Sequence, residues 1–208
     1  MAVAHVWAFT AVTVPFVAAP GASTAVVLRN SVSGGVRAGV ATALGVNAAS
    51  VCFGLLAAFG VALAVQRWPI VWVALRIAGA IYLASLGLRS LWRATAGHRG
   101  VAAALASRPS VHWTRNIAEG FFTNALNPSI ATFYLLVLPQ FIPRDAPFVA
   151  TALLLTSIHV GLAISWHIAW AAAGGSLSEA LNRPGPRRTL ESITGMALLA
   201  LAVKIAIF

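Results

Sequence analysis

Six long apolar stretches follow one another along this chain, and they limit its fold more than any other feature. Each holds about the 20 apolar residues that a helix needs to cross the hydrocarbon core of a bilayer. Helices are expected because a helix satisfies its backbone hydrogen bonds within its own segment, as lipid requires. With 60% hydrophobic residues, the chain is also more apolar than a soluble core of this size requires. The sequence predicts an all-α polytopic membrane protein with six transmembrane helices, at residues 6–28, 38–65, 69–92, 117–141, 148–173 and 190–208.

Two proline-centred interruptions lie inside the first and fourth stretches. The first is Pro20-Gly21 and the second is Asn127-Pro128, so the two prolines stand about half the chain apart. A proline in a helix removes one backbone hydrogen bond and clashes with the preceding turn. In a bilayer, the freed carbonyl needs a partner within protein or in a water-filled cavity. Paired breaks at corresponding positions of two halves therefore point to a transport site.

An odd number of helices in each half means that the second half enters the membrane from the opposite side. We therefore expect a 3+3 inverted repeat with helix breaks in spans one and four. The predicted units are a first three-helix repeat at 1–92, a basic cytoplasmic linker at 93–116 and a second three-helix repeat at 117–208.

Arginine placement predicts how these helices are oriented. The net charge is +10, and most of the arginines follow the first, third and fifth stretches. Connections rich in arginine stay on the cytoplasmic side. We expect a bacterial-type inner (plasma) membrane protein with both termini outside, membrane lipid as a partner and no nucleic-acid partner. The arginines in those connections are Arg29, Arg37, Arg89, Arg93, Arg99, Arg108, Arg115, Arg183, Arg187 and Arg188.

Three blocks of sequence carry a family resemblance. They are PGASTAVVLRNSVSGGVRAGVATALGV, LRIAGAIYLASLGLRSLW and GFFTNALNPSIATFYLLVLPQF, in this order. Together they resemble the LysE/RhtB family of amino-acid exporters. The resemblance implies a secondary exporter of amino acids or related small polar metabolites, driven by proton antiport through alternating access. Three positions depart from the family pattern, since Ala22, Ser50 and Ser129 stand where many members carry Pro, Asp and Lys.

The predicted solute site lies where the two breaks face a cavity near the membrane centre. N–H groups at the start of a half-helix would hold a substrate carboxylate, because that end carries partial positive charge. Carbonyls at the end of a half-helix would hold an ammonium, and an amino acid carries both charges. The alternative is a pair of packing kinks. The candidate residues are Pro20, Gly21, Ser23, Thr24, Asn124, Asn127 and Pro128.

Three more polar residues lie within the second and third stretches. Asn47 and Ser50 are three positions apart and share one helix face, where they either line the cavity or form interhelical hydrogen bonds. Arg76 lies inside the third stretch, and an arginine near the membrane centre costs at least roughly 2.5 kcal/mol. It either binds a substrate carboxylate or a gating partner, or extends its side chain to the interface.

Two titratable residues complete the candidates. His159, near the middle of the fifth stretch, is the candidate proton carrier, because histidine titrates near neutral pH and the family's Asp in the second stretch is missing. The alternative is a neutral histidine that hydrogen-bonds a neighbouring helix. Glu119 follows Arg115 by four residues, which predicts a local ion pair or a group that attracts cationic solutes.

Other function classes find less support in the sequence. Export of divalent cations requires clustered carboxylates, whereas the four acidic residues map near the ends of stretches. The chain lacks the phosphate-binding Gly-x-x-x-x-Gly-Lys-Ser/Thr loop and the His-Glu-x-x-His motif. We therefore expect no enzyme activity, no cofactor and no bound metal, and an amino acid as the small-molecule partner. A membrane assembly factor that transports nothing is an alternative, and a homo-oligomer is left open.

Overall fold

The structure is a computed structural model that describes most of the chain. It covers residues 2–19, 21–61, 70–96 and 112–182, with Trp68 and scattered positions between 185 and 203. Within these residues every regular element is helical, and no strand occurs. This agrees with the all-α class that the apolar stretches predict. Pro20 and most of the predicted linker lie outside the described residues.

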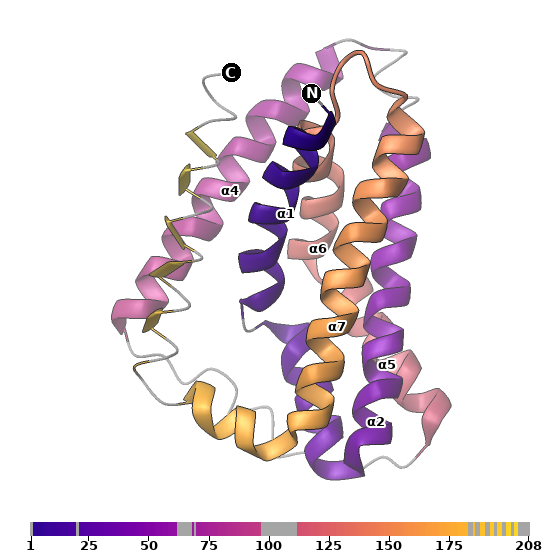
Figure 1. Ribbon diagram of the computed structural model, residues 1–208, viewed down its shortest axis with the longest axis vertical. Coiled ribbons are helices and arrows are strands. Elements are labelled where there is room, and N and C mark those ends of the chain that lie inside the picture. Colours follow the sequence, from indigo (N-terminus) through magenta and orange to yellow (C-terminus); the bar gives the residue numbers. More distant parts are fainter. Residues whose placement is uncertain are drawn as a thin grey trace.

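Six labelled helices form an elongated bundle (Figure 1). They are α1 (Ala2–Ala18), α2 (Ala22–Leu55), α4 (Ile70–Ala96), α5 (Trp113–Ala125), α6 (Pro128–Thr132) and α7 (Phe148–Asn182). Two of them continue in other helical forms. The π-helical segment Leu56–Val61 extends α2, while the π-helical Phe133–Val137 and the 3-10 turn Leu138–Phe141 extend α6.

Helix α2 is a hairpin of two helical segments. Gly35 has φ 79° and ψ 173°, a left-handed backbone conformation that glycine adopts without strain. The chain reverses there, so residues 22–34 pack along the segment that follows. The Asn30 Nδ2 donates to Thr42 Oγ1 at 2.9 Å, and a Cβ placed on Gly39 would meet the Ser31 Cβ at 2.7 Å. The reversal lies between the first two predicted stretches.

The chain bends sharply at two places. The axes of His5–Ala18 and Ala22–Val32 differ by 50°, and those of Trp113–Ala125 and Pro128–Phe141 differ by 57°. Figure 1 shows the first bend as the step between α1 and the start of α2. At the second bend Asn127 caps α6, because its Oδ1 accepts from the Ser129 N–H at 3.0 Å. Pro128 follows at the first helical position, where its missing N–H is tolerated.

Among the described residues, two helices are long and apolar enough to cross a membrane. They are Gly34–Val61 and Phe148–Ala173, and the number rises to four if each bent pair forms one span. The described part of the chain therefore contains several membrane-crossing helices. The arrangement of six spans as a 3+3 inverted repeat stays a prediction.

The two halves of the chain meet closely between α2 and α5. A Cβ on Gly45 would lie 1.9 Å from the Ile117 carbonyl oxygen, and one on Gly120 would lie 2.1 Å from the Thr42 carbonyl oxygen. Any side chain at these positions would collide with backbone. The two glycines thus allow the helices to approach as closely as small residues do in membrane helix pairs.

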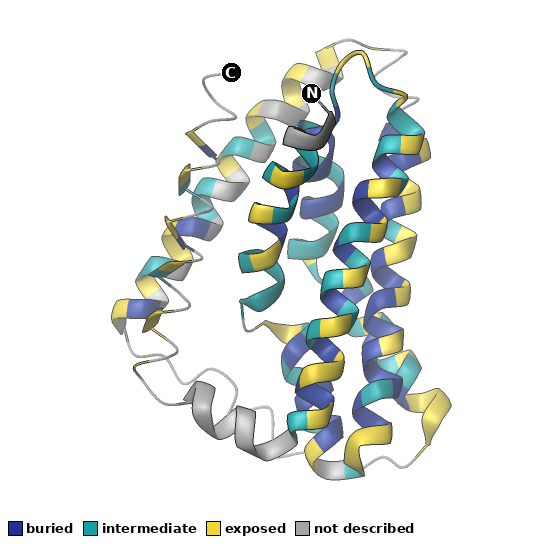
Figure 2. Ribbon diagram, viewed as in Figure 1, coloured by how far each residue is buried: buried dark blue, intermediate teal, exposed yellow. Residues whose placement is uncertain are grey.

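Aromatic side chains form the core at the other end of the bundle. Phe9 of α1 contacts Phe141 edge-on at a ring distance of 5.4 Å, and Phe16 stacks on Phe133 at 4.5 Å. These contacts join the first helix to the segment after the second bend. Figure 2 shows buried positions on the facing sides of the helices and exposed positions on their outer sides. Many outer positions are large apolar residues, as expected for a surface that faces lipid.

Candidate functional site

Asn124 is the centre of a hydrogen-bond network that joins the two halves. It lies near the end of α5 and is fully buried. Its Oδ1 accepts from the Ser23 hydroxyl at 2.8 Å, and its Nδ2 donates to the Val46 carbonyl at 2.8 Å and to Ser50 Oγ at 2.9 Å. One amide therefore connects the start of α2, the middle of α2 and the helix that precedes the second bend.

Two more polar side chains extend this network toward α7. The Tyr134 hydroxyl lies near Ser50 but makes no hydrogen bond of ordinary geometry. The Tyr134 ring lies 5.0 Å from the imidazole of His159, measured between ring centres. We refer to Ser23, Asn124, Ser50, Tyr134 and His159 as the polar track. It runs through the interior from the first bend to α7.

The polar track contains hydrogen-bonding atoms without partners in the described structure. The Tyr134 hydroxyl and the His159 Nδ1 are buried and unpaired, as are some groups outside the track, among them the hydroxyls of Thr13 and Thr156. A buried polar group without a partner costs about 1–3 kcal/mol, so such groups are rare and call for an explanation. A polar solute that enters this region is one explanation, because its own groups would supply the missing partners.

His159 is enclosed by aromatic rings from two other segments. Its imidazole centre lies 4.8 Å from Phe133 and 6.2 Å from Phe16, and the side chain is 1% exposed. The histidine that hydrogen-bonds a neighbouring helix is instead His167, whose Nδ1 lies 3.3 Å from the Asn47 Nδ2. The Asn47 Nδ2 also donates to the Ala43 carbonyl at 2.8 Å, and its Oδ1 is buried without a partner.

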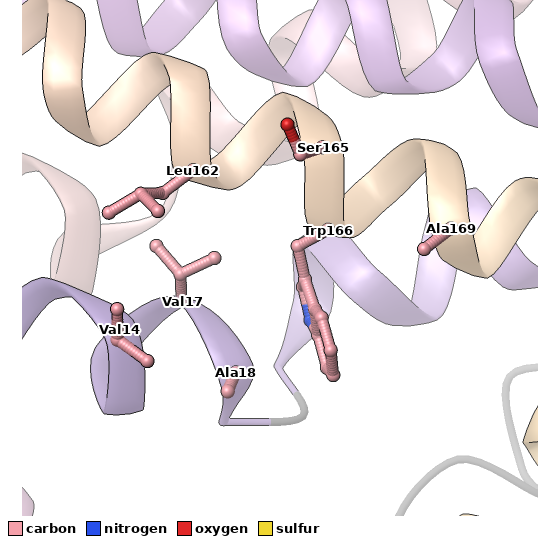
Figure 3. Close-up of a pocket in the computed structure, with 7 residues that line it drawn as sticks. All are labelled: Val14, Val17, Ala18, Leu162, Ser165, Trp166 and Ala169. Carbon is pink, nitrogen blue, oxygen red and sulfur yellow. The ribbon is translucent and has the colours of Figure 1, made fainter.

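An apolar pocket lies beside the first bend, between the end of α1 and α7 (Figure 3). Its volume is about 300 Å³, near the lower end of the roughly 300–1,000 Å³ of ligand pockets. Apart from Ser165 and the indole N–H of Trp166, the lining groups are hydrocarbon. They are Val14, Val17, Ala18, Leu162, Ser165, Trp166 and Ala169.

Charged side chains meet at a different place, toward the turn of α2. Arg29 forms an ion pair with Glu119 of α5, and the Asn30 Nδ2 donates to the same carboxylate at 2.8 Å. The sequence predicts Arg115 as the partner of Glu119, but the structure pairs it with Arg29 on another helix. Spacing along one helix shows only local pairs, so it misses a partner that tertiary packing supplies.

Four of the predicted residues lie on the polar track, namely Ser23, Ser50, Asn124 and His159. Asn47 lies one helical turn before Ser50, but its side chain contacts Ala43 and His167. Thr24 is buried at 2% exposure, next to Ser23. Sequence reasoning missed Tyr134, because a tyrosine in an apolar run is also typical of a packed core.

Other predicted site residues lie outside the network. Gly21 is exposed at the start of α2, Asn127 caps α6 with its side chain, and Pro128 is exposed. Pro20 lies outside the described residues, and so does the side chain of Arg76, whose backbone belongs to α4.

Comparison with known proteins identifies the family. The LysE type translocators match residues 14–207. An uncharacterized membrane protein of Bacillus subtilis, YrhP, is 24% identical over 189 residues, which cover 89% of this chain and 90% of that protein. The leucine efflux protein of Salmonella typhimurium is 32% identical over 145 residues, 70% of this chain and 66% of that protein.

A second leucine efflux protein, from Enterobacter, is 29% identical over 157 residues, which cover 74% of this chain and 71% of that protein. No solved structure matches the chain. Because the family match spans nearly the whole chain, including both bends and the polar track, this multi-pass membrane protein belongs to the LysE family of translocators.

Proposed function

We propose that this translocator exports amino acids with uncharged aliphatic side chains from the cytoplasm. The observation that carries the proposal is the polar track, which joins the two halves and leaves buried polar atoms unpaired. Two relatives named leucine efflux proteins, at 32% and 29% identity, support an amino acid as the solute. If the interior only packed helices together, we would expect nearly all of its buried polar groups to have hydrogen-bond partners.

The first bend offers partners for both charges of an amino acid. Helix α1 ends at Ala18, and Pro20 has no N–H to donate to the Phe16 carbonyl four residues earlier, so that carbonyl would be available to an ammonium. Helix α2 starts at Ala22, where the first N–H groups and the helix dipole favour a carboxylate. Ser23 and Asn124 add side-chain groups beside this start.

The apolar pocket beside the same bend supports a hydrocarbon side chain. Val14 and Leu162 supply methyl groups, and Ala18 connects the pocket to the end of α1. A charged side chain would lose its hydration there without gaining a partner. A leucine-like solute would gain about 25 cal/mol for each Å² of apolar surface removed from water.

Energy for export would come from a proton gradient, with the two halves alternating in access around the track. His159 is the proposed proton carrier, because it is the imidazole on the track and its Nδ1 is free to accept a proton. Protonation would place a charge among aromatic faces, which attract cations. The histidine would thus couple proton movement to a rearrangement of the Tyr134 and Phe133 side chains.

Metabolite profiling tests the proposed function in cells. Cells that express the protein should accumulate a neutral aliphatic amino acid in the medium, and cells that express Asn124→Ala at equal membrane abundance should not. Thr151→Ala serves as the control, because this partly buried threonine at the start of α7 donates its hydroxyl to the nearby Pro147 carbonyl at 3.0 Å and lies outside the polar track. A membrane assembly factor would instead leave the composition of the medium unchanged in every strain.

A further inference from the structure

The ion pair between Arg29 and Glu119 joins the two halves at one end of the bundle. Arg29 lies near the end of the first segment of α2, and Glu119 lies in α5. The guanidinium contacts Glu119 Oε1, and the Asn30 Nδ2 donates to Oε2 at 2.8 Å. Both carboxylate oxygens are therefore held by residues of the other half.

Neighbouring side chains position this pair. The Arg29 Nε donates to Asn30 Oδ1 at 3.3 Å, which orients the amide toward Glu119. The Asn30 Nδ2 also donates to Thr42 Oγ1 at 2.9 Å, and that hydroxyl donates to the Ala38 carbonyl at 2.8 Å. The cluster thus includes both segments of the α2 hairpin and α5.

The cluster lies between the polar track and the end of the bundle that carries arginines. On α5, Glu119 precedes Asn124 by five residues, or about 8 Å along a helix. On α2, Arg29 follows Ser23 by six residues, or about 9 Å. Beyond the pair lie the exposed Arg37 and Arg115, and in Figure 1 the turn of α2 and the start of α5 share this end. The charge rule predicts that this end faces the cytoplasm.

Close backbone contact between α2 and α5 also blocks the path from the polar track to this end of the bundle, beside the ion pair. Gly120 follows Glu119, and its Cα faces the Thr42 carbonyl so closely that a Cβ would lie 2.1 Å from that oxygen. Gly45 makes the equivalent approach to Ile117. A solute cannot pass between α2 and α5 here unless the helices separate, and separation breaks the ion pair.

We propose that Arg29, Asn30 and Glu119 form the inner gate of this translocator, closed in the structure. The proposal rests on the proposed function, since a gate requires a solute that passes it. The side chains of Arg29 and Glu119 are partly exposed, at 21% and 34%, and solvent weakens an ion pair of this kind. The pair is thus weak enough to open. A passing amino acid would replace it, with its carboxylate on Arg29 and its ammonium on Glu119.

Thiol labelling tests this gate without any transported solute. The chain has one cysteine, Cys52, so Cys52→Ser removes background labelling, and Ser50→Cys places a nearly isosteric reporter on the polar track at a residue 2% exposed. A membrane-impermeant maleimide is added to inside-out and to right-side-out vesicles. In this parent protein, we expect slow labelling from the cytoplasmic face.

Glu119→Gln and Arg29→Gln should each speed labelling from the cytoplasmic face by about fivefold, the response to a shift of about 1 kcal/mol in the opening equilibrium. Labelling from the outer face should not rise. The exchanged pair Arg29→Glu with Glu119→Arg should return the rate to that of the parent. Arg37→Gln, which removes an exposed arginine just after the turn of α2, should leave the rate unchanged.

Parental labelling rates in both single variants would overturn the gate, and so would an equal increase of the labelling rate in the Arg37→Gln variant. If the charge variants fail to reach the membrane, Thr42→Val provides a second test, because it removes only the hydroxyl that accepts from Asn30. It should speed cytoplasmic labelling by about two- to threefold, and no change would count against the gate. Absence of amino-acid counterflow would refute the proposed function separately.

Discussion

Replacement of Gly120 by alanine should destabilise the contact between the two halves. A Cβ at this position would lie 2.1 Å from the Thr42 carbonyl oxygen and 3.1 Å from the Val46 nitrogen. Both are backbone atoms of α2, so no side-chain rotation relieves the overlap. An ordinary Cβ contact is 3.4–4 Å long, so the helices would have to separate by about 1 Å or more, a gap that forfeits at least a quarter to a half of the dispersion energy at this contact.

The magnitude follows from opposing terms. Overpacking a close-packed contact costs about 1–3 kcal/mol, and the loss of hydrogen bonds at Asn124 or Asn30 adds about 1 kcal/mol for each bond. Alanine favours the helix by about 1 kcal/mol relative to glycine, which offsets part of this cost. We therefore expect a net loss of about 2 kcal/mol in the free energy of unfolding, with a lower midpoint of thermal unfolding in detergent.

Gly161 of α7 provides the matched control. A Cβ at this position meets no atom within 4 Å, so Gly161→Ala gains helix propensity without a clash. Its midpoint of thermal unfolding should stay the same or rise. A Gly120→Ala protein as stable as the parent would refute the close approach of α2 and α5, and with it the blocked route beside the ion pair.

Three further predictions follow from the track, the cap and the pocket. His159→Gln should remove the dependence of transport on a pH gradient in proteoliposomes while amino-acid exchange at equal pH persists, and undiminished coupling would exclude this histidine as proton carrier. Asn127→Ala should lower stability by about 1 kcal/mol because α6 loses its cap, whereas Asn127→Ser should retain most of it, as thermal unfolding will show. Val14→Phe should fill the apolar pocket and lower counterflow of leucine relative to alanine; an unchanged ratio would place the solute's side chain elsewhere.

The sequence was a good guide to the helices and a partial guide to the site. Apolar runs and proline chemistry act locally, so they predicted an all-helical membrane chain and singled out Asn127-Pro128, where the axes bend by 57°. The same local logic did not foresee that the Asn127 side chain caps α6, apart from the polar track, and its role in binding a solute stays a prediction. A polar residue beside a helix break commonly caps the helix that starts there.

Contacts between distant segments could not be predicted from spacing. Ser23 and Asn124 were both candidates because each lies near a break, but their hydrogen bond depends on how α2 packs on α5. Glu119 illustrates this limit of sequence spacing. Its possible partner Arg115, four residues earlier, was evident in the sequence, whereas its actual partner Arg29, ninety positions earlier, was not. Tyr134 was hidden in the same way, because an aromatic residue in an apolar run is typical of a packed core.

Counterflow of radiolabelled leucine into proteoliposomes tests the central claim most directly. Proteoliposomes that contain the purified protein and are loaded with unlabelled leucine should accumulate the label transiently. The Asn124→Ala protein, reconstituted at equal amount and orientation, should show an initial rate at least about tenfold lower, the effect of losing about 1.4 kcal/mol of interaction with the passing solute. Full counterflow by the Asn124→Ala protein would contradict a solute route along the polar track.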